Sequence, residues 1–242
     1  MMGIIGGTGL NSFHQGAPAG DRLTPYGETS TDIIRSEIEG ASVLFLARHG
    51  EPHRIPPHRV NYRANIWALK QLGVSKLVAV NAVGGISSEM PAGSLIIPDQ
   101  IVDYSYGRDH TFYDGDNGQL EHIDFSFPFT NELRKSIADA ASASNINVIN
   151  GATLGVTQGP RLESAAEINR MDSDGCELVG MTAMPEAALA RELGIDYASI
   201  CLVVNPAAGR SNALITMEQI NDVLQFGMTD VRRLLLAVIA AS

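Results

Sequence analysis

The chain has 242 residues, of which 45% are apolar and only 18% are charged, and its formal net charge is −10 at pH 7. This length suits one large α/β domain over residues 1–242, and the acidic balance argues against nucleic-acid or anionic-membrane surfaces, which need clustered Lys and Arg. The charged fraction lies below the roughly 25% of an average soluble domain, so we expect other subunits to cover part of the surface.

Short β-rich runs alternate with helical patterns along the chain, which predicts an α/β fold. Strands are expected at residues 3–5, 42–46, 76–80, 94–102, 147–157 and 197–204, and helices at 61–72, 130–144, 163–171, 185–193 and 216–239. Gly73 follows the first helical pattern as a C-terminal stop. Residues 103–129 lack periodicity and predict a long functional loop or a lid.

The N-terminus, the length of the apolar stretches and the number of cysteines indicate the cellular compartment. The first ten residues do not resemble a secretory signal, and no apolar stretch approaches the roughly 18 residues that cross a bilayer. The two cysteines, Cys176 and Cys201, are fewer than a disulfide framework normally uses. We therefore expect a cytoplasmic protein with reduced, buried thiols.

The first candidate ligand site is the glycine-rich strand end GIIGGTGL at residues 3–10. Its main-chain N–H groups and the Thr8 hydroxyl can hold a phosphate, although such strand ends are also common tight turns. Ser12 stands where a dinucleotide-binding turn needs a third glycine, and no Lys-Ser/Thr follows as in a P-loop. Dinucleotide and ATP binding are therefore disfavoured.

The second candidate is LARHG at residues 46–50, an apolar strand that ends in Arg48 and His49. The Arg48 guanidinium matches phosphate oxygens and His49 can supply another donor, while a surface Arg beside a packed His is the alternative. His49, His53 and His58 are interrupted by prolines, which deny them a common helical face. No metal is predicted.

Four further segments place small or polar residues after apolar runs. They are VAVNAVGGI at 78–86, QGPRLE at 158–163, ELVGMTAMPE at 177–186 and VNP at 204–206. Taken singly, Glu163 could be a solvated carboxylate at a helix start, Met181 core filler and Asn205 a turn residue. The six segments in this order carry more weight than any one of them.

Together these segments resemble the trimeric purine nucleoside phosphorylase and methylthioadenosine phosphorylase family, over nearly the whole chain. Residues 6–10, 46–50, 60–69 (VNYRANIWAL), 112–115 (FYDG) and 180–186 are most similar to the methylthioadenosine branch. The resemblance implies a central mixed, partly barrel-like β-sheet flanked by helices, and a homotrimer or a hexamer of two trimers. It also implies ordered phosphorolysis, with inorganic phosphate as co-substrate and no cofactor.

The resemblance also implies the site residues. Phosphate would contact Thr8, Arg48, His49, Thr182 and the Ala82 backbone, and Arg48, His49 and Asn205 would be catalytic. Met181 would lie against the sugar, Leu162 against the purine, and His122 would reach a neighbouring subunit's sugar 5′ end. The full nucleoside set is Asn81, Ala82, Gly84, His122, Leu162, Glu163, Val179, Gly180, Met181, Asn205, Ala207, Ile215 and Met217.

The base-recognition residues depart from the methylthioadenosine branch, which carries Asp at the position of Asn205. A Glu163 carboxylate can accept the N1 hydrogen of a 6-oxopurine but would face a lone pair in adenine, and the Asn205 amide can donate to O6 or N7. The apolar residues 213–217 match the methylthio branch and would bury a methylthio group. The expected substrate is therefore S-methyl-5′-thioinosine.

Other readings stay open. The nearest are a methylthioadenosine phosphorylase that tolerates Asn205 and a general inosine and guanosine phosphorylase. A nucleoside-binding protein that has kept the fold and lost turnover is a non-enzymatic alternative, and Ser12 disfavours a dinucleotide-dependent oxidoreductase.

Overall fold

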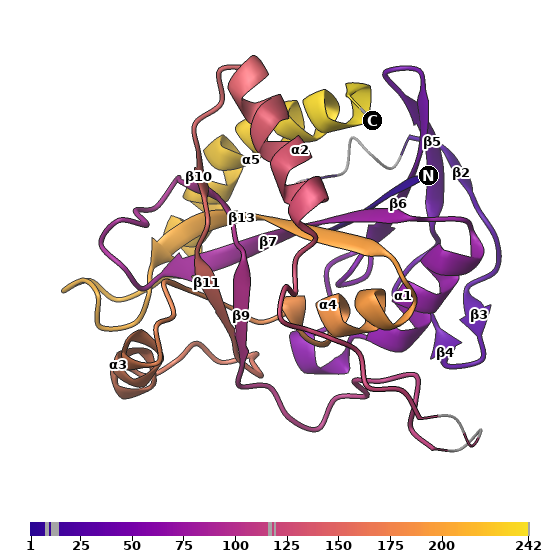
Figure 1. The fold of residues 1–242 in the computed structure, drawn as a ribbon. Coiled ribbons are helices and arrows are strands. Elements are labelled where there is room, and N and C mark those ends of the chain that lie inside the picture. The colour runs from indigo at the N-terminus through magenta and orange to yellow at the C-terminus, as the bar shows by residue number, and fades with distance from the viewer. Residues whose placement is uncertain (8–9, 11–14, 116–117, 119, 242) are drawn as a thin grey trace.

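The structure is a computed structural model that describes residues 1–7, 10, 15–115, 118 and 120–241. Its centre is one mixed sheet, in which β10, β8, β13, β7, β1, β6, β5 and β2 follow one another (Figure 1). The strands on this path are β1 (Met2–Gly6), β2 (Ala17–Pro18), β5 (Ile34–Ile38), β6 (Ala41–Ala47), β7 (Lys76–Gly85), β8 (Leu95–Ile97), β10 (Val148–Asn150) and β13 (Asp196–Pro206). A separate hairpin joins β3 (Leu23–Thr24) to β4 (Gly27–Glu28).

A branch leaves this path at β7. The strand β12 (Leu178–Gly180) pairs antiparallel with Gly84 and Gly85 of β7, and β11 (Thr153–Val156) and β9 (Gln100–Asp103) continue from it. The predicted mixed α/β sheet is confirmed, and the strands of the described residues form no closed barrel.

Helices cover both faces of the sheet (Figure 1). One side carries α2 (Asn131–Ala143) and α5 (Met217–Ala240), and the other carries α1 (Tyr62–Gln71) and α4 (Ala183–Glu192). The helix α3 (Ala165–Ser173) packs beside the branch, and a 3-10 turn spans Pro57–Arg59. Along β13, Tyr197, Cys201 and Val203 face the core under α1 and α4, while Ala198 and Leu202 face the other core. Burial on both faces explains why this strand is continuously apolar.

The ends of the helices follow local chemistry. The Asn61 side chain accepts the Ala64 N–H at the start of α1, and Gly73 ends it with φ of 88°. The predicted stop at Gly73 is therefore confirmed. In α3, Ser164 and Glu167 form a capping box, so the helix begins at Ala165 rather than at the expected Glu163.

Two predicted strands are each broken into two. Residues 94–102 form β8 and β9, and residues 147–157 form β10 and β11. The breaks lie at Pro98 and Gly151, whose φ is 110°, and each run passes there from the main path into the branch. The Asp99 carboxylate accepts the Ala152 N–H and ties the two breaks together.

The described residues of 104–129 contain no helix or strand, as expected for a loop, yet Phe112 within this segment is buried. Cys176 and Cys201 are buried and free. None of the helices in the described part of the chain has the length and hydrophobicity of a bilayer-spanning segment.

Candidate active site

Four parallel strands deliver their carboxyl ends to one edge of the sheet. β1 runs parallel to β6 and β7, and β7 runs parallel to β13. This edge is where open α/β sheets place ligands. A cavity of about 520 Å³ lies there, bounded by the residues that follow the strands.

The cavity brings together nearly all the residues predicted from the sequence. It is lined by Arg48, His49, Asn81, Ala82, Gly84, Leu162, Glu163, Val179, Gly180, Met181, Thr182, Asn205, Ala207, Ile215 and Met217. Thr8 lies outside the described residues. His122 is exposed and does not line this cavity in the single chain. The role of each residue stays a prediction.

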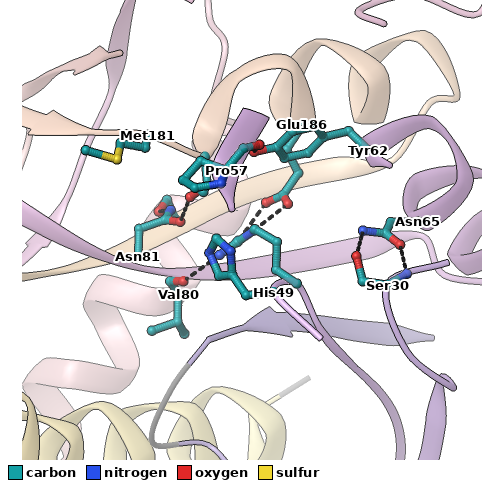
Figure 2. Close-up of polar contacts among 12 residues, drawn as sticks. Ser30, His49, Pro57, Tyr62, Asn65, Val80, Asn81, Met181 and Glu186 are labelled. Atoms are coloured by element: carbon teal, nitrogen blue, oxygen red, sulfur yellow. Dashed lines mark hydrogen bonds and ion pairs between the residues drawn. The ribbon is translucent and has the colours of Figure 1, made fainter. Parts of the chain in front are cut away.

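Arg48 is held by a carboxylate that the sequence did not single out. Its Nε and Nη2 atoms donate to the two oxygens of Glu186, both at 2.8 Å, and Nη1 donates to the Val80 carbonyl at 3.1 Å (Figure 2). Tyr197 also donates to Glu186 at 2.9 Å. Arg48 and Glu186 are fully buried; burial disfavours the charged guanidinium, but Glu186 outweighs it and raises the pKa of Arg48. Three of its five N–H groups are used, which leaves at most two for a ligand.

His49 is a neutral ring fixed by its backbone partner. Its Nδ1 lies 2.8 Å from the Ile55 carbonyl, which can only accept, so Nδ1 carries the hydrogen and Nε2 is the acceptor. Burial, and then the charge of Arg48, lower the pKa of His49 to about 4. The ring stacks on His53 with centroids 4.4 Å apart. The neutral ring therefore offers a ligand an acceptor at Nε2, and the expected donor role would require that the charge of a bound anion raise the pKa of His49 enough for the ring to be protonated.

A buried hydrogen-bonded chain orders Thr182. The Asn81 amide donates to Ser199 at 2.6 Å, and its oxygen accepts the Thr182 hydroxyl at 2.8 Å (Figure 2). Asn81, Thr182 and Ser199 are all buried. Asn81 thus acts on the cavity wall through Thr182, which must rotate its hydroxyl to donate to a ligand.

The two predicted base-recognition residues each have a local partner. Thr157 donates its hydroxyl to Glu163 at 2.6 Å, which fixes one carboxylate oxygen. The Asn205 amide donates to the Pro206 carbonyl at 2.7 Å, which uses one of its two N–H groups and leaves the other for a ligand. Glu163 also borders a second, more polar cavity of about 470 Å³ between residues 103–106 and 157–171.

One wall of the main cavity comes from α5. Ile220, Asn221, Leu224 and Met228 continue the face that begins at Met217. Their spacing of three and four residues is the period of one helix face. This pattern was present in the sequence, but it did not show that the face borders a cavity rather than the core.

Other residues of the site gave weaker signals. Glu186 lies inside the quoted segment 177–186, but its partner Arg48 is far away in sequence. His53, Arg54, Pro56 and Pro57 line the cavity from the proline-rich loop. Among the described residues, no group of three or more His, Cys, Asp or Glu side chains is placed to hold a metal ion.

Comparison with known proteins gives concordant matches. The model of the phosphorylase superfamily matches residues 2–240. A protein of Pseudomonas syringae named probable S-methyl-5′-thioinosine phosphorylase is 51% identical, over 99% of this chain and 98% of its own length. The 6-oxopurine nucleoside phosphorylase of Pyrococcus furiosus is 42% identical, over 98% and 91%.

The fold has solved counterparts. The structure of methylthioadenosine phosphorylase from Schistosoma mansoni with adenine superposes with a TM-score of 0.91 at 30% identity, covering 99% of this chain and 90% of the other. The same protein in its apo form gives a TM-score of 0.88.

Proposed function

Because the chain belongs to the phosphorylase superfamily, we propose that it cleaves S-methyl-5′-thioinosine with inorganic phosphate, yielding hypoxanthine and 5-methylthioribose 1-phosphate. The observation that carries this proposal is a single cavity lined by Arg48, Glu163, Asn205 and the apolar start of α5. It thus holds groups suited to an anion, an oxopurine and an apolar 5′ substituent.

The phosphate would lie against Arg48, His49 and Thr182. At neutral pH phosphate carries a hydrogen, which it can donate to the acceptor Nε2 of His49 while Arg48 donates to its unprotonated oxygens. Held there, the phosphate stands beneath C1′ and stabilises the cationic sugar that develops as the bond to N9 lengthens. A phosphate oxygen then bonds to C1′, and the electron pair of the broken bond leaves with the purine.

The purine would be read by Glu163 and Asn205. The Glu163 oxygen that does not accept from Thr157 can take the N1 hydrogen of hypoxanthine, while Asn205 donates to O6 or N7 and stabilises the departing base. Adenine has no hydrogen on N1. The name of the Pyrococcus furiosus relative agrees with an oxopurine, and the two relatives together support the combination proposed here.

The 5′ substituent would lie against Ile215, Met217 and the α5 face. Methylthio burial among these side chains is favourable, whereas a 5′-hydroxyl would lose water partners there. This wall favours S-methyl-5′-thioinosine over inosine, the substrate of a general oxopurine phosphorylase.

A substrate panel tests the proposal. Release of free base is measured from methylthioinosine, inosine and methylthioadenosine, each with and without phosphate, using the double variant Arg48→Met with Glu186→Met as the inactive control, because it leaves no unpaired buried charge. We expect phosphate-dependent turnover, with the highest kcat/KM on methylthioinosine. Preference for methylthioadenosine or inosine would select one of the alternatives, and binding without turnover would make the chain a nucleoside-binding protein.

We further propose a homotrimer, or a hexamer of two trimers, that works in purine salvage in the cytoplasm. In this assembly His122 would reach the site of a neighbouring subunit. The proposed reaction uses phosphate as co-substrate and requires no organic cofactor or metal.

A further inference from the structure

Arg108 is a buried cation in the segment 104–129 that the proposed chemistry does not use. Its guanidinium is surrounded by oxygen atoms from three parts of the chain. Nε donates to the Gln158 side chain at 3.1 Å, and Nη2 donates to the carbonyls of Thr157 and Gln158 at 3.1 and 2.9 Å. Nη1 donates its two hydrogens to the Met181 carbonyl at 2.8 Å and to the Met184 carbonyl, and the Tyr62 hydroxyl shares one of them at 3.4 Å.

The acceptors are four main-chain carbonyls, a side-chain amide and a phenol, and none of them is a carboxylate. Burial therefore lowers the pKa of Arg108, with Tyr62 and Asp103 partly opposing this shift. The ordinary pKa of arginine is so high that the side chain stays charged. Charge-assisted hydrogen bonds to carbonyls are stronger than neutral ones, so the guanidinium draws these carbonyls together.

The two groups of carbonyls follow neighbouring strands, β11 and β12, whose last sheet pair is Val156 with Gly180 and whose ends are joined by the Thr157 N–H, which donates to the Gly180 carbonyl at 2.8 Å. Met181 and Met184 flank Thr182, so their carbonyls fix the turn between β12 and α4. The other group follows β11, where Thr157 orients Glu163 through its hydroxyl. One planar guanidinium therefore joins the turn that carries a proposed phosphate ligand to the strand end that orients the base-reading carboxylate.

We propose that Arg108 is a positioning residue, which holds the residues just beyond the last β11–β12 pair, the Met181–Thr182 turn and the Thr157–Glu163 segment, in fixed relative positions and so aligns phosphate with the nucleoside. This inference rests on the proposed function for its catalytic consequence. Its structural part, that one guanidinium holds both segments, stands on the contacts alone.

Arg63 offers a matched control. It anchors the same segment by ion pairs to Asp109 at 2.8 Å and Asp114 at 3.0 Å, and it stacks over Tyr26, but these contacts involve no residue of the main cavity. Arg63→Met therefore loosens residues 108–114 without removing a bond to the turn or the strand end. Any loss of activity in Arg108→Met beyond that in Arg63→Met can therefore be attributed to the hydrogen bonds between Arg108 and the carbonyls.

The experiment compares Arg108→Met, Arg108→Lys and Arg63→Met with the unmodified enzyme. Since a misplacement of about 1 Å can reduce a rate on the order of 10²-fold, kcat/KM should fall on that scale for Arg108→Met, with KM for phosphate raised. Arg108→Lys keeps the charge but lacks the planar fork, so its loss should be intermediate. Arg63→Met should stay within about threefold of the unmodified enzyme, because it leaves these carbonyls bonded.

Hydrogen exchange provides a readout that needs no turnover. Peptides covering 156–163 and 178–186 should exchange faster in Arg108→Met than in Arg63→Met, with little change elsewhere. If Arg108→Met does not fold, Arg108→Lys serves for both measurements.

Three results would overturn the proposal. These are equal effects of Arg108→Met and Arg63→Met, a loss of kcat that tracks the fraction of folded enzyme with KM unchanged, or an increase in exchange spread evenly over the chain. If the unmodified enzyme releases no base with phosphate, the proposed function fails, and the exchange experiment still decides whether Arg108 holds the two segments.

Discussion

Replacing Glu186 by glutamine changes one atom of a buried carboxylate and leaves its shape intact. One oxygen of Glu186 accepts from Arg48 Nη2 and from Tyr197, and the other accepts from Arg48 Nε. In its best orientation the glutamine amide places its oxygen where it still accepts from Arg48 Nη2 and Tyr197. Its NH2 group then faces Arg48 Nε, so that two donors oppose each other. The Arg48 charge then remains buried without a counter-charge.

Removing one partner of a buried ion pair destabilises a protein by about 3–5 kcal/mol. In a chain of this length each kcal/mol corresponds to roughly 2–4 °C, so Glu186→Gln should lower Tm by about 6–20 °C. Urea unfolding at fixed protein concentration measures the loss of free energy directly, because assembly makes Tm depend on concentration. Arg161→Met, which breaks the exposed pair between Arg161 and Glu167, should change the free energy of unfolding far less, because water screens that pair.

The double variant Arg48→Met with Glu186→Met separates the charge from the packing. Apolar side chains of similar volume often replace a buried ion pair without loss, so the double variant should recover most of the stability lost by Glu186→Gln. Phosphate-dependent turnover should stay abolished, because the proposed phosphate ligand is gone. A loss below about 1 kcal/mol for Glu186→Gln would refute the view that this pair holds Arg48 in place.

Three further predictions concern the other walls of the cavity. The pKa of His49 is lowered to about 4 in the folded protein, from an ordinary value of 6.5. The folded protein therefore favours the neutral ring, and the stability that this preference contributes above pH 6.5 is lost as the pH falls toward 4. In phosphate-free buffer the free energy of unfolding should therefore drop between about pH 6.5 and 4 by at most about 3 kcal/mol more than in His49→Gln, and equal slopes would contradict the assignment. Asn205→Asp combined with Glu163→Gln should move base preference from the oxopurine toward adenine by tenfold or more, on the order of the discrimination that one matched hydrogen bond supplies, as measured by kcat/KM on methylthioinosine and methylthioadenosine. A double variant with unchanged preference would count against this base assignment. Ile215→Asn should reduce the preference for methylthioinosine over inosine by about fourfold, the equivalent of burying one methyl group, whereas Leu214→Asn, at an 86% exposed position outside the cavity wall, should change it little.

The parts of the fold that could be predicted from the sequence are those whose signal is local. β7 and β13 are buried on both faces and read as continuous apolar runs, and α1 carries its cap and its stop within a few residues. The edge strand β2 and its neighbour β5 were not predicted, because they are short or largely unburied and have no apolar run.

In the site, too, residues with a local sequence signal could be predicted, and those that depend on tertiary contacts could not. Strand ends such as Arg48 and Asn205 stand out because polar residues follow apolar ones. The partners that determine the chemistry of these residues cannot be recognised in the sequence, since Glu186 contacts Arg48 only in the tertiary fold. Likewise, the carbonyl of Ile55 decides which nitrogen of His49 carries hydrogen, and a backbone carbonyl leaves no trace in a sequence.

The pairing of β7 with β13 has a consequence for folding during synthesis. Lys76 of the first strand lies beside Asp196 of the second, so about 120 residues must be synthesised and looped out before this central contact forms. Until β13 emerges from the ribosome, β7 has an open edge, and the segment that bears Asn205 does not yet exist. The enzyme should therefore gain its activity late and in one step, and chains that end before residue 196 should require chaperone protection.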